Sequence, residues 1–128
     1  MPLHLRIVTP RRVAFDQTVL DVRAPGFLGE FGALEGHERY LSAVRPGRVQ
    51  VSLEEGEQVF VVGAGFVEVG PDHVILLSDH CEAVGSVSAE QAREELQEAE
   101  KRLTGLQEGS AAWAEAERRA DLARARLG

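Results

Sequence analysis

Residues 59–77, VFVVGAGFVEVGPDHVILL, contain three short apolar runs separated by glycine-rich breaks. The runs at 59–62 and 74–77 are continuous and rich in branched side chains, which is typical of strands buried on both faces. The breaks at 63–65 and 70–72 carry Gly and Pro, whose backbone preferences suit tight turns. This part of the chain is therefore expected to form consecutive β-strands.

Similar short runs occupy the chain before residue 59. Apolar and polar side chains alternate along residues 3–8, 19–24 and 48–53, and because successive strand residues point to opposite faces, this places one set in a core. Short strands about ten residues apart indicate a β-sandwich or barrel. No helix-length segment separates them, so parallel crossovers are not expected. We predict an antiparallel β-sandwich domain over residues 1–86.

The chain changes character after Ser86, because no proline follows and Ala, Glu, Arg and Leu dominate. Ser88 with Gln91 has the spacing of a capping box, and Ser110 can cap a second helix. Apolar residues recur in steps of three and four, which places them on one stripe of each helix. The stripes are Ala92, Leu96, Ala99, Leu103 and Leu106, then Trp113, Ala116, Ala120, Ala123 and Leu127.

Two such helices are expected to pack antiparallel as a hairpin domain over residues 87–128, which completes an α+β fold. Both stripes are rich in Ala, so the helices can approach closely but bury little area. Each buried CH₂ contributes only roughly 0.8 kcal/mol. We therefore expect the hairpin to be weakly held and able to detach.

Composition narrows the classes of function. Hydrophobic residues make up 44% of the chain, enough for a packed core, and the net charge of −7 disfavours nucleic-acid binding. The single Cys81 cannot form an intrachain disulfide. The first residues lack the apolar run of a signal peptide, and no window approaches the roughly 20 apolar residues of a membrane span. Direct membrane insertion is not expected, so a partner would have to bring the chain to a membrane.

No constellation of catalytic residues is evident. Residues 79–81 (DHC) place three metal-ligand types together, but neighbouring strand residues point to opposite faces, so no metal site is expected. The Gly-x-Gly at 63–65 is followed by a strand-like run rather than a helix, which favours a close approach of backbones over a dinucleotide site. We predict a non-catalytic protein without a cofactor.

Residues 26–47, GFLGEFGALEGHERYLSAVRPG, hold a density of glycines that a plain sandwich edge does not need. The tight path they impose would present Glu30, Glu35 and His37 on loops, and loops on a rigid scaffold are where partners bind. An ordinary glycine-rich crossover is the equally weighted alternative.

This segment resembles the glycine-rich signature of the F-type ATP synthase epsilon subunit, with GEFG at 29–32, Gly36-His37 and Pro46-Gly47 in the family's order. The strand-like segments around it and the two terminal helices also fall in that order, so the resemblance covers nearly the whole chain. It departs from the family at Glu35, where Pro is usual, and at 38–40, where Ala-Pro-Leu is usual.

The resemblance implies a non-catalytic subunit that rotates with gamma in the central stalk and couples proton flow through the c-ring to ATP synthesis. The sandwich would sit beside gamma, and its loop with Glu30 and Phe31 would touch the c-ring, with Gly36 and His37 in the same surface region. The subunit would be peripheral, on the cytoplasmic face of a bacterial plasma membrane rather than on a chloroplast thylakoid.

The resemblance also implies two positions of the hairpin, folded on the sandwich or extended toward the alpha/beta catalytic head, where it inhibits ATP hydrolysis. Arg118, Arg119, Arg124 and Arg126 would then face the beta subunits. The alternative is a solvated face on which these arginines pair with neighbouring carboxylates.

Some family members bind ATP on the hairpin through an Ile/Leu-Asp-x-x-Arg-Ala motif. The nearest match is 115–120 (EAERRA), where only Arg119-Ala120 fits, so tight ATP binding is not expected. Two other functions stay open from the residues alone. One is a free-standing sandwich that acts as an adaptor, and the other is a small barrel enzyme, for which clustered ligands on facing strands are lacking.

Overall fold

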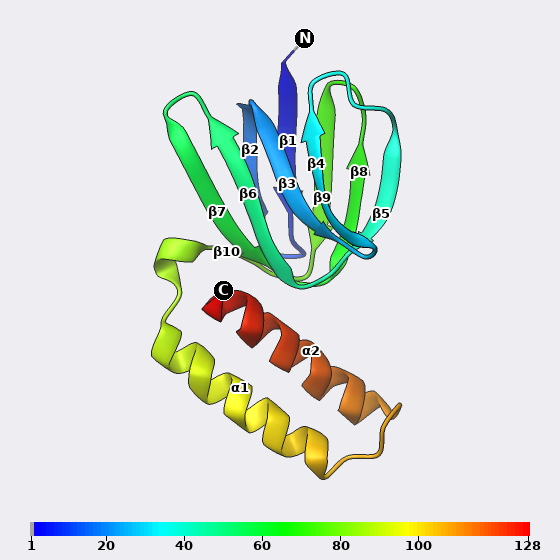
Figure 1. The fold of residues 1–128 in the computed structure, drawn as a ribbon, viewed down its shortest axis with the longest axis vertical. Helices are drawn as coiled ribbons and strands as arrows, with labels where there is room; N and C mark the ends of the chain where they lie inside the picture. Colours follow the sequence, from blue (N-terminus) through cyan, green and yellow to red (C-terminus); the bar gives the residue numbers. More distant parts are fainter. Residues whose placement is uncertain (1) are drawn as a thin grey trace.

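The computed structural model describes residues 2–128 and has two parts, a β-sandwich and a helical hairpin below it (Figure 1). Ten strands form within these residues. They are β1 (Leu3–Val8), β2 (Val13–Val19), β3 (Asp21–Gly26), β4 (Gly29–Leu34), β5 (Tyr40–Val44), β6 (Gly47–Leu53), β7 (Gly56–Val62), β8 (Gly65–Val69), β9 (His73–Ser78) and β10 (Cys81–Ala83).

Hydrogen bonds join the strands in the order β10-β7-β6-β3-β5-β8-β9-β1-β2, with β4 also paired to β3. The predicted sandwich followed by two helices is confirmed, and almost every strand pair is antiparallel, as expected. The exception is β1 with β9, which are parallel, with His4 opposite His73. The expectation of no parallel crossover is wrong for this pair, because the whole sandwich from β2 to β8, rather than a helix, supplies the connection.

The core of the sandwich is built from large apolar side chains of alternating strand positions. Its fully buried members include Leu3, Leu5, Ile7 and Leu76, together with seven valines. Phe15 of β2 and Phe60 of β7 meet edge to face at 5.4 Å, so β2, at one end of the strand order, packs against β7 near the other end. The sheet thereby closes over one core.

The Gly-x-Gly at 63–65 marks a close approach of backbones, as expected. A Cβ added at Gly65 would lie 1.8 Å from the carbonyl oxygen of Leu77, and one at Gly63 would lie 1.9 Å from a carboxylate oxygen of Asp79. No side chain fits at Gly65, because the obstructing atom belongs to the backbone of the neighbouring strand β9.

A single 3₁₀ turn, Val84–Ser86, leads from β10 to the hairpin helices α1 (Ala89–Thr104) and α2 (Ala111–Leu127). Both predicted caps are present. The Ser88 side chain accepts a hydrogen bond from the Gln91 N–H, and the Ser110 side chain accepts one from the Trp113 N–H. The domain boundary between residues 86 and 87 stays a prediction.

The seam of the hairpin is made of alanine. The buried residues of α1 are Ala92 and Ala99, and those of α2 are Ala116, Ala120, Ala123 and Ala125. The leucines of the predicted stripes and Trp113 are only half-buried. The seam is therefore close and thin, as its composition indicates.

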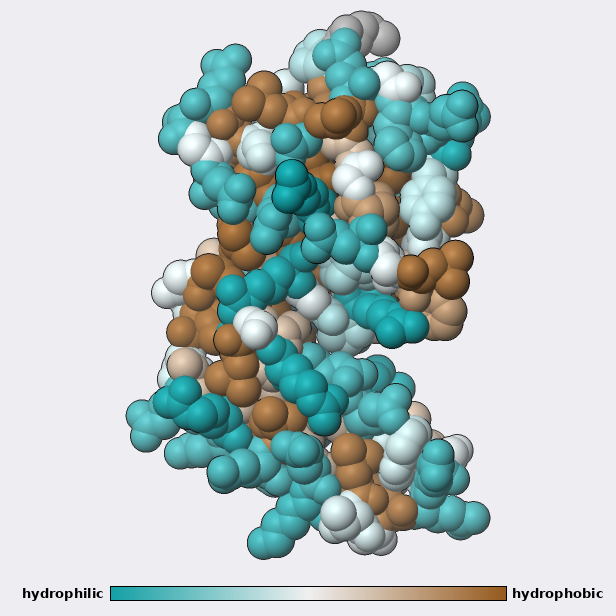
Figure 2. Space-filling model, viewed as in Figure 1, coloured by the Kyte–Doolittle hydropathy of each residue, from teal (hydrophilic) through white to brown (hydrophobic). Residues whose placement is uncertain are grey.

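Helix α2 lies between α1 and the sandwich and approaches the sandwich with its C-terminal end (Figure 1), where it packs on β6 and β7. Along the middle of α2 the molecule is hollowed on one side (Figure 2), at a cavity of about 640 Å³ lined by residues that include Phe27, Arg45 and Asp121. The two parts therefore touch over a limited area at one end of α2.

Candidate functional site

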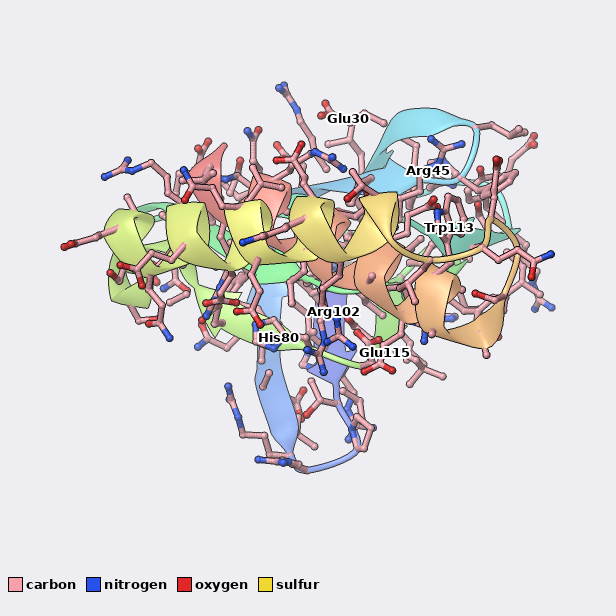
Figure 3. The ribbon with its side chains drawn as sticks, turned by 90° about the horizontal axis from the view of Figure 1, so that it is seen from below. Glu30, Arg45, His80, Arg102, Trp113 and Glu115 are labelled. Atoms are coloured by element: carbon pink, nitrogen blue, oxygen red, sulfur yellow. The ribbon has the colours of Figure 1, made fainter. Side chains whose placement is uncertain are left out.

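The tip of the β3–β4 hairpin is the most exposed apolar point of the sandwich. Leu28 is 91% exposed, and beside it the ring of Phe27 lies 4.9 Å from the guanidinium of Arg45. Glu30, opposite Pro25 in the next register of the hairpin, is exposed, and it lies at the outer edge of the molecule seen from below (Figure 3). A partner can therefore reach an apolar tip and a carboxylate together.

Phe31 has different surroundings from Glu30, because adjacent strand residues point to opposite faces. Its ring packs against the sandwich core and meets Tyr40 edge to face at 5.2 Å. His37 approaches the same Tyr40 ring at 6.4 Å. These three rings hold the segment that joins β4 to β5, so Phe31 has a packing role in this structure.

Gly36 and His37 do not share a surface region with Glu30, contrary to expectation. Glu30 stands at the start of β4, whereas Gly36 follows its other end, and a six-residue strand is about 20 Å long. The Gly36 N–H donates to the Pro71 carbonyl at 2.7 Å, with φ of +83° at this glycine. The pair therefore belongs to the end of the sandwich near the turn at 70–72, away from the hairpin tip.

A row of apolar side chains crosses the outer face of five neighbouring strands, and the sequence reasoning missed it. The residues stand directly opposite one another in the order Ala43, Phe66, Leu77, Val8 and Val13. Phe66 is 60% exposed and Leu77 is 51% exposed. Four strand spacings make the row about 20 Å long. A contiguous exposed apolar patch of this kind marks an interaction surface.

Ionisable side chains flank this apolar row on the same face. The ring of His73 lies between two carboxylates, with Nδ1 3.0 Å from Asp72 and Nε2 3.1 Å from Glu68. Its hydrogen bond with Asp72, and then that with Glu68, raises the pKa of His73 above its ordinary value, and the pKa of Asp72 is lowered in return. On the adjacent strands, Asp16 accepts from His4 and pairs with Arg6.

Three of the four predicted hairpin arginines are exposed. Arg119 pairs with Glu115 at 2.9 Å and Arg124 with Asp121 at 3.0 Å, both along α2. These are the local pairs of the solvated-face alternative, and exposed pairs of this kind contribute about 0–1 kcal/mol. Arg118 lines a cavity of about 300 Å³ between α2 and the sandwich. All three can turn toward a partner at little cost.

Arg126 departs from the expected set, because it points inward. Its guanidinium binds both carboxylate oxygens of Glu82, at 2.5 and 3.1 Å, and Glu95 of α1 at 2.7 Å. The hydrogen bond to Glu82 raises the pKa of Arg126, and the same bond lowers the pKa of Glu82. In this position of the hairpin Arg126 is not available to a partner.

Arg48 of β6 makes a second contact of this kind, also missed from the sequence. It donates to the carbonyl oxygens of Ala125 and Arg126, at 3.0 Å each. A cation is favourable there, because the last carbonyls of a helix carry partial negative charge and lack partners in the helix.

Sites for small molecules are weakly developed in the described residues. A cavity of about 200 Å³ between the helices is lined by residues that include Glu95, Glu98, Arg102 and Arg119, which is small for a nucleotide. Cys81 is buried, and burial raises the pKa of its thiol. Within residues 2–128 no three His, Cys, Asp or Glu side chains gather as ion ligands, and neither helix has the length and apolar character to span a bilayer.

Residues 2–84 match the family model described as ATP synthase, Delta/Epsilon chain, beta-sandwich domain. Two bacterial proteins named ATP synthase epsilon chain are similar over most of their length. That of Anaeromyxobacter sp. (strain Fw109-5) is 40% identical over 108 residues, which cover 84% of this chain and 82% of the relative. That of Myxococcus xanthus (strain DK1622) is 35% identical over 104 residues, 81% of this chain and 76% of the relative.

Two solved structures share the fold. A chain of the Euglena gracilis mitochondrial ATP synthase, solved with OSCP, F1 and the c-ring, has a TM-score of 0.84 at 21% identity and covers 96% of this chain and 78% of its own length. A chain of the Tetrahymena thermophila mitochondrial ATP synthase central stalk and c-ring has a TM-score of 0.67 at 12% identity, with 98% and 94% covered. Taken with the glycine-rich signature, the matched sandwich and the epsilon-chain relatives, these findings mean that the chain belongs to the ATP synthase epsilon chain family.

Proposed function

We propose that this chain is a non-catalytic subunit of the rotary stalk, anchored by its sandwich and regulating ATP hydrolysis with its hairpin. The observation that carries the proposal is the division of the molecule. One part is rigid, with a large core and an exposed apolar face, and the other is held to it at one end only. A rigid part with an exposed apolar face can anchor the chain to a partner. A part that is held at one end only can move, and we call it the brake because we propose that its movement inhibits ATP hydrolysis.

The apolar row through Phe66 and Leu77 is the surface that we assign to gamma. A central stalk partner that rotates with this chain must hold it firmly, and burial of exposed apolar area is the main source of such affinity. The tip at Phe27 and Leu28, with Glu30 beside it, is the contact that we assign to the c-ring. The separation of the two surfaces suits a subunit that transmits torque between gamma and the c-ring.

Gly36 and His37 keep a proposed role near gamma, at the end of the sandwich. They lie far from the tip, so their contact would be separate from that of Glu30. Phe31 acts through Tyr40 by holding the loop between them.

The hairpin is the proposed brake. In an extended position, Arg118, Arg119 and Arg124 would face acidic segments of the beta subunits. Their present carboxylate partners lie on the same helix and are exposed, so exchanging them for a partner's carboxylates costs little. The chain would reside at the cytoplasmic face of a bacterial plasma membrane through its partners, and it needs no cofactor.

The test uses a gamma-containing catalytic head that lacks epsilon. The full chain and a chain truncated after Ser86 are added, and binding and ATP hydrolysis are measured. We expect both to bind and only the full chain to lower hydrolysis. If neither binds a head from a related bacterium, the stalk proposal fails and the adaptor alternative takes its place. If both bind and neither inhibits, the anchor stands and the brake fails.

A matched pair of variants tests the assigned face. Leu77→Asp places a charge in the middle of the apolar row, and Leu20→Asp places one at a comparably exposed position between β2 and β3, which is not a member of the row; the two side chains are 51% and 53% exposed. We expect the first to weaken binding to the head by roughly tenfold or more, since an interface centre carries most of the affinity, and the second to change it little. Equal binding by both would place the gamma contact elsewhere.

A further inference from the structure

The contact between the sandwich and the hairpin is concentrated in one charged cluster. Among residues 2–128, the side-chain hydrogen bonds that cross between the two parts all involve Arg48 or Arg126. The cluster consists of Arg48 of β6, Glu82 of β10, Glu95 of α1 and Arg126 of α2, and we call it the docking cluster. Each of its members comes from a different element.

Arg126 is the centre of this cluster. Its Nε and one terminal nitrogen form a bidentate pair with Glu82, while the other terminal nitrogen binds Glu95. One guanidinium therefore ties the last strand of the sandwich, the first helix and the second helix together. Planar bidentate pairing of this kind is the geometry in which an arginine binds a carboxylate most strongly, and a lysine could not replace it.

The pair is shielded from water, unlike the other ion pairs of α2. The side chains of Arg126 and Glu82 are 16% and 18% exposed, whereas those of Arg124 and Asp121 are 52% and 42% exposed. Removing one member of a shielded pair leaves the other charge poorly solvated, so the loss exceeds that from an exposed pair. The same helix thus carries a strong pair and a weak one two residues apart.

The other contacts between the sandwich and the hairpin are less extensive. The residues of α2 that are buried are alanines, and cavities of about 300 and 640 Å³ lie between the middle of α2 and the sandwich, both lined in part by Pro46. Apolar packing at this junction is therefore incomplete, although Val61 of β7, which α2 packs on, is fully buried. The docking cluster supplies the side-chain hydrogen bonds of the junction.

We propose that the docking cluster is a latch that holds the hairpin against the sandwich, with Arg126 as its positioning residue. While the latch is closed, Arg126 cannot bind a partner, and when it opens, Glu82, Glu95 and the end of α2 are freed together. Docking and any contact of Arg126 with another subunit are thus mutually exclusive. The part of this inference that concerns an extended hairpin in the complex rests on the proposed function, whereas the latch itself does not.

The test uses the isolated full chain with nitroxide labels at Glu55→Cys, in the loop after β6, and Glu108→Cys, in the loop between the helices. Both positions are exposed, and native Cys81 is buried, so labelling is selective. Distances between the labels are measured by pulsed electron resonance. We expect one narrow distribution for the unsubstituted chain, and a roughly tenfold or greater rise of a second, broad population for Arg126→Gln and for Glu82→Gln. Each substitution removes the bidentate pair and leaves the other shielded charge with one partner only, Glu82 with His80 or Arg126 with Glu95.

The matched control is Arg124→Gln, which removes an exposed arginine from the same turn of α2 and should leave the distribution unchanged. The double variant Glu82→Gln/Arg126→Gln should release the hairpin no more than the single variants, because the two residues act through one interaction. Glu95→Gln should release it less, since that side chain is 41% exposed.

Unchanged distances for both Arg126→Gln and Glu82→Gln would overturn the latch, as would an equal release by Arg124→Gln. If one variant fails to fold, judged by its circular dichroism, the other decides. Release in the isolated chain together with failure to bind a gamma-containing head would leave the latch standing and remove the stalk proposal. Binding to the head without any release of the hairpin in the isolated chain would leave the stalk proposal standing and remove the latch.

Discussion

The sandwich and the hairpin are stabilised in different ways. The sandwich buries leucine, isoleucine, valine and phenylalanine from strands that are distant in the sequence. The hairpin buries only alanines, from two helices that are adjacent in the sequence. A buried Leu contributes about 2–3 kcal/mol and a methyl group about 0.8 kcal/mol. The difference means that the same chain can keep a rigid anchor while its helices move.

The two parts also differ in the range of the interactions that determine their structure. Helix ends are set by local hydrogen bonds, such as those of Ser88 and Ser110, whereas the sandwich depends on long-range pairings such as β1 with β9. Local structure can therefore persist in a detached hairpin, although isolated helices of this length are marginal in water.

The largest effect is expected in the sandwich core. Leu76→Ala removes a side chain that is 1% exposed and should lower the free energy of unfolding by about 3 kcal/mol, since it removes apolar contacts and leaves a cavity. Leu77→Ala, at the next position of the same strand but half exposed, should change it by less than about 0.5 kcal/mol. Urea unfolding followed by far-ultraviolet circular dichroism measures the free energy of unfolding of the two variants. Equal losses would mean that burial does not decide stability here.

A smaller effect is expected at the close approach of β8 to β9. Gly65→Ala would push a methyl group into the Leu77 carbonyl and should cost about 1–3 kcal/mol as the strands separate. Gly85→Ala is the control, because its Cβ would meet nothing within 4 Å. Thermal unfolding of the two variants tests the prediction. A stable Gly65→Ala protein would show that β8 can shift without loss.

The hairpin seam should respond more weakly and locally. Ala120→Gly removes one buried methyl group and lowers helix propensity, a loss of about 2 kcal/mol in total. Ala112→Gly, at an exposed position in the first turn of α2, should lose at most the propensity part, less than about 1 kcal/mol. Amide hydrogen exchange should show faster exchange in α1 and α2 and unchanged exchange in the sandwich strands. Faster exchange in the core strands would mean that the two parts unfold together.

The smallest effect concerns the histidine on the outer face. Because Asp72 and Glu68 raise the pKa of His73, its stabilising contribution is full below the ordinary pKa of about 6.5 and is lost as the pH rises through the raised value. A carbon-detected NMR titration of the imidazole should show the raised pKa, and Asp72→Asn should bring it down. No change in Asp72→Asn would remove Asp72 as the cause.

Much of this architecture was predictable from local chemistry. The strand runs, both serine caps, the alanine seam and the tight approach at Gly65 each follow from a few neighbouring residues. One error was avoidable, because residues two apart on a helix point to different sides. Arg124 and Arg126 could not both face the same partner, and that spacing was the available signal for an inward Arg126.

Other features were settled only when distant segments came together. The apolar row requires the register of five strands, so Phe66, Leu77 and Val13 give no signal as neighbours in the chain. The latch requires Arg48, Glu82 and Arg126 to meet across up to 78 residues of sequence separation. The residues by themselves determined two amphipathic helices after a sandwich, since periodicity and capping act over a few positions. Which charges the fold shields, and which apolar side chains it leaves exposed, depended on long-range packing, and only the tertiary structure decided it.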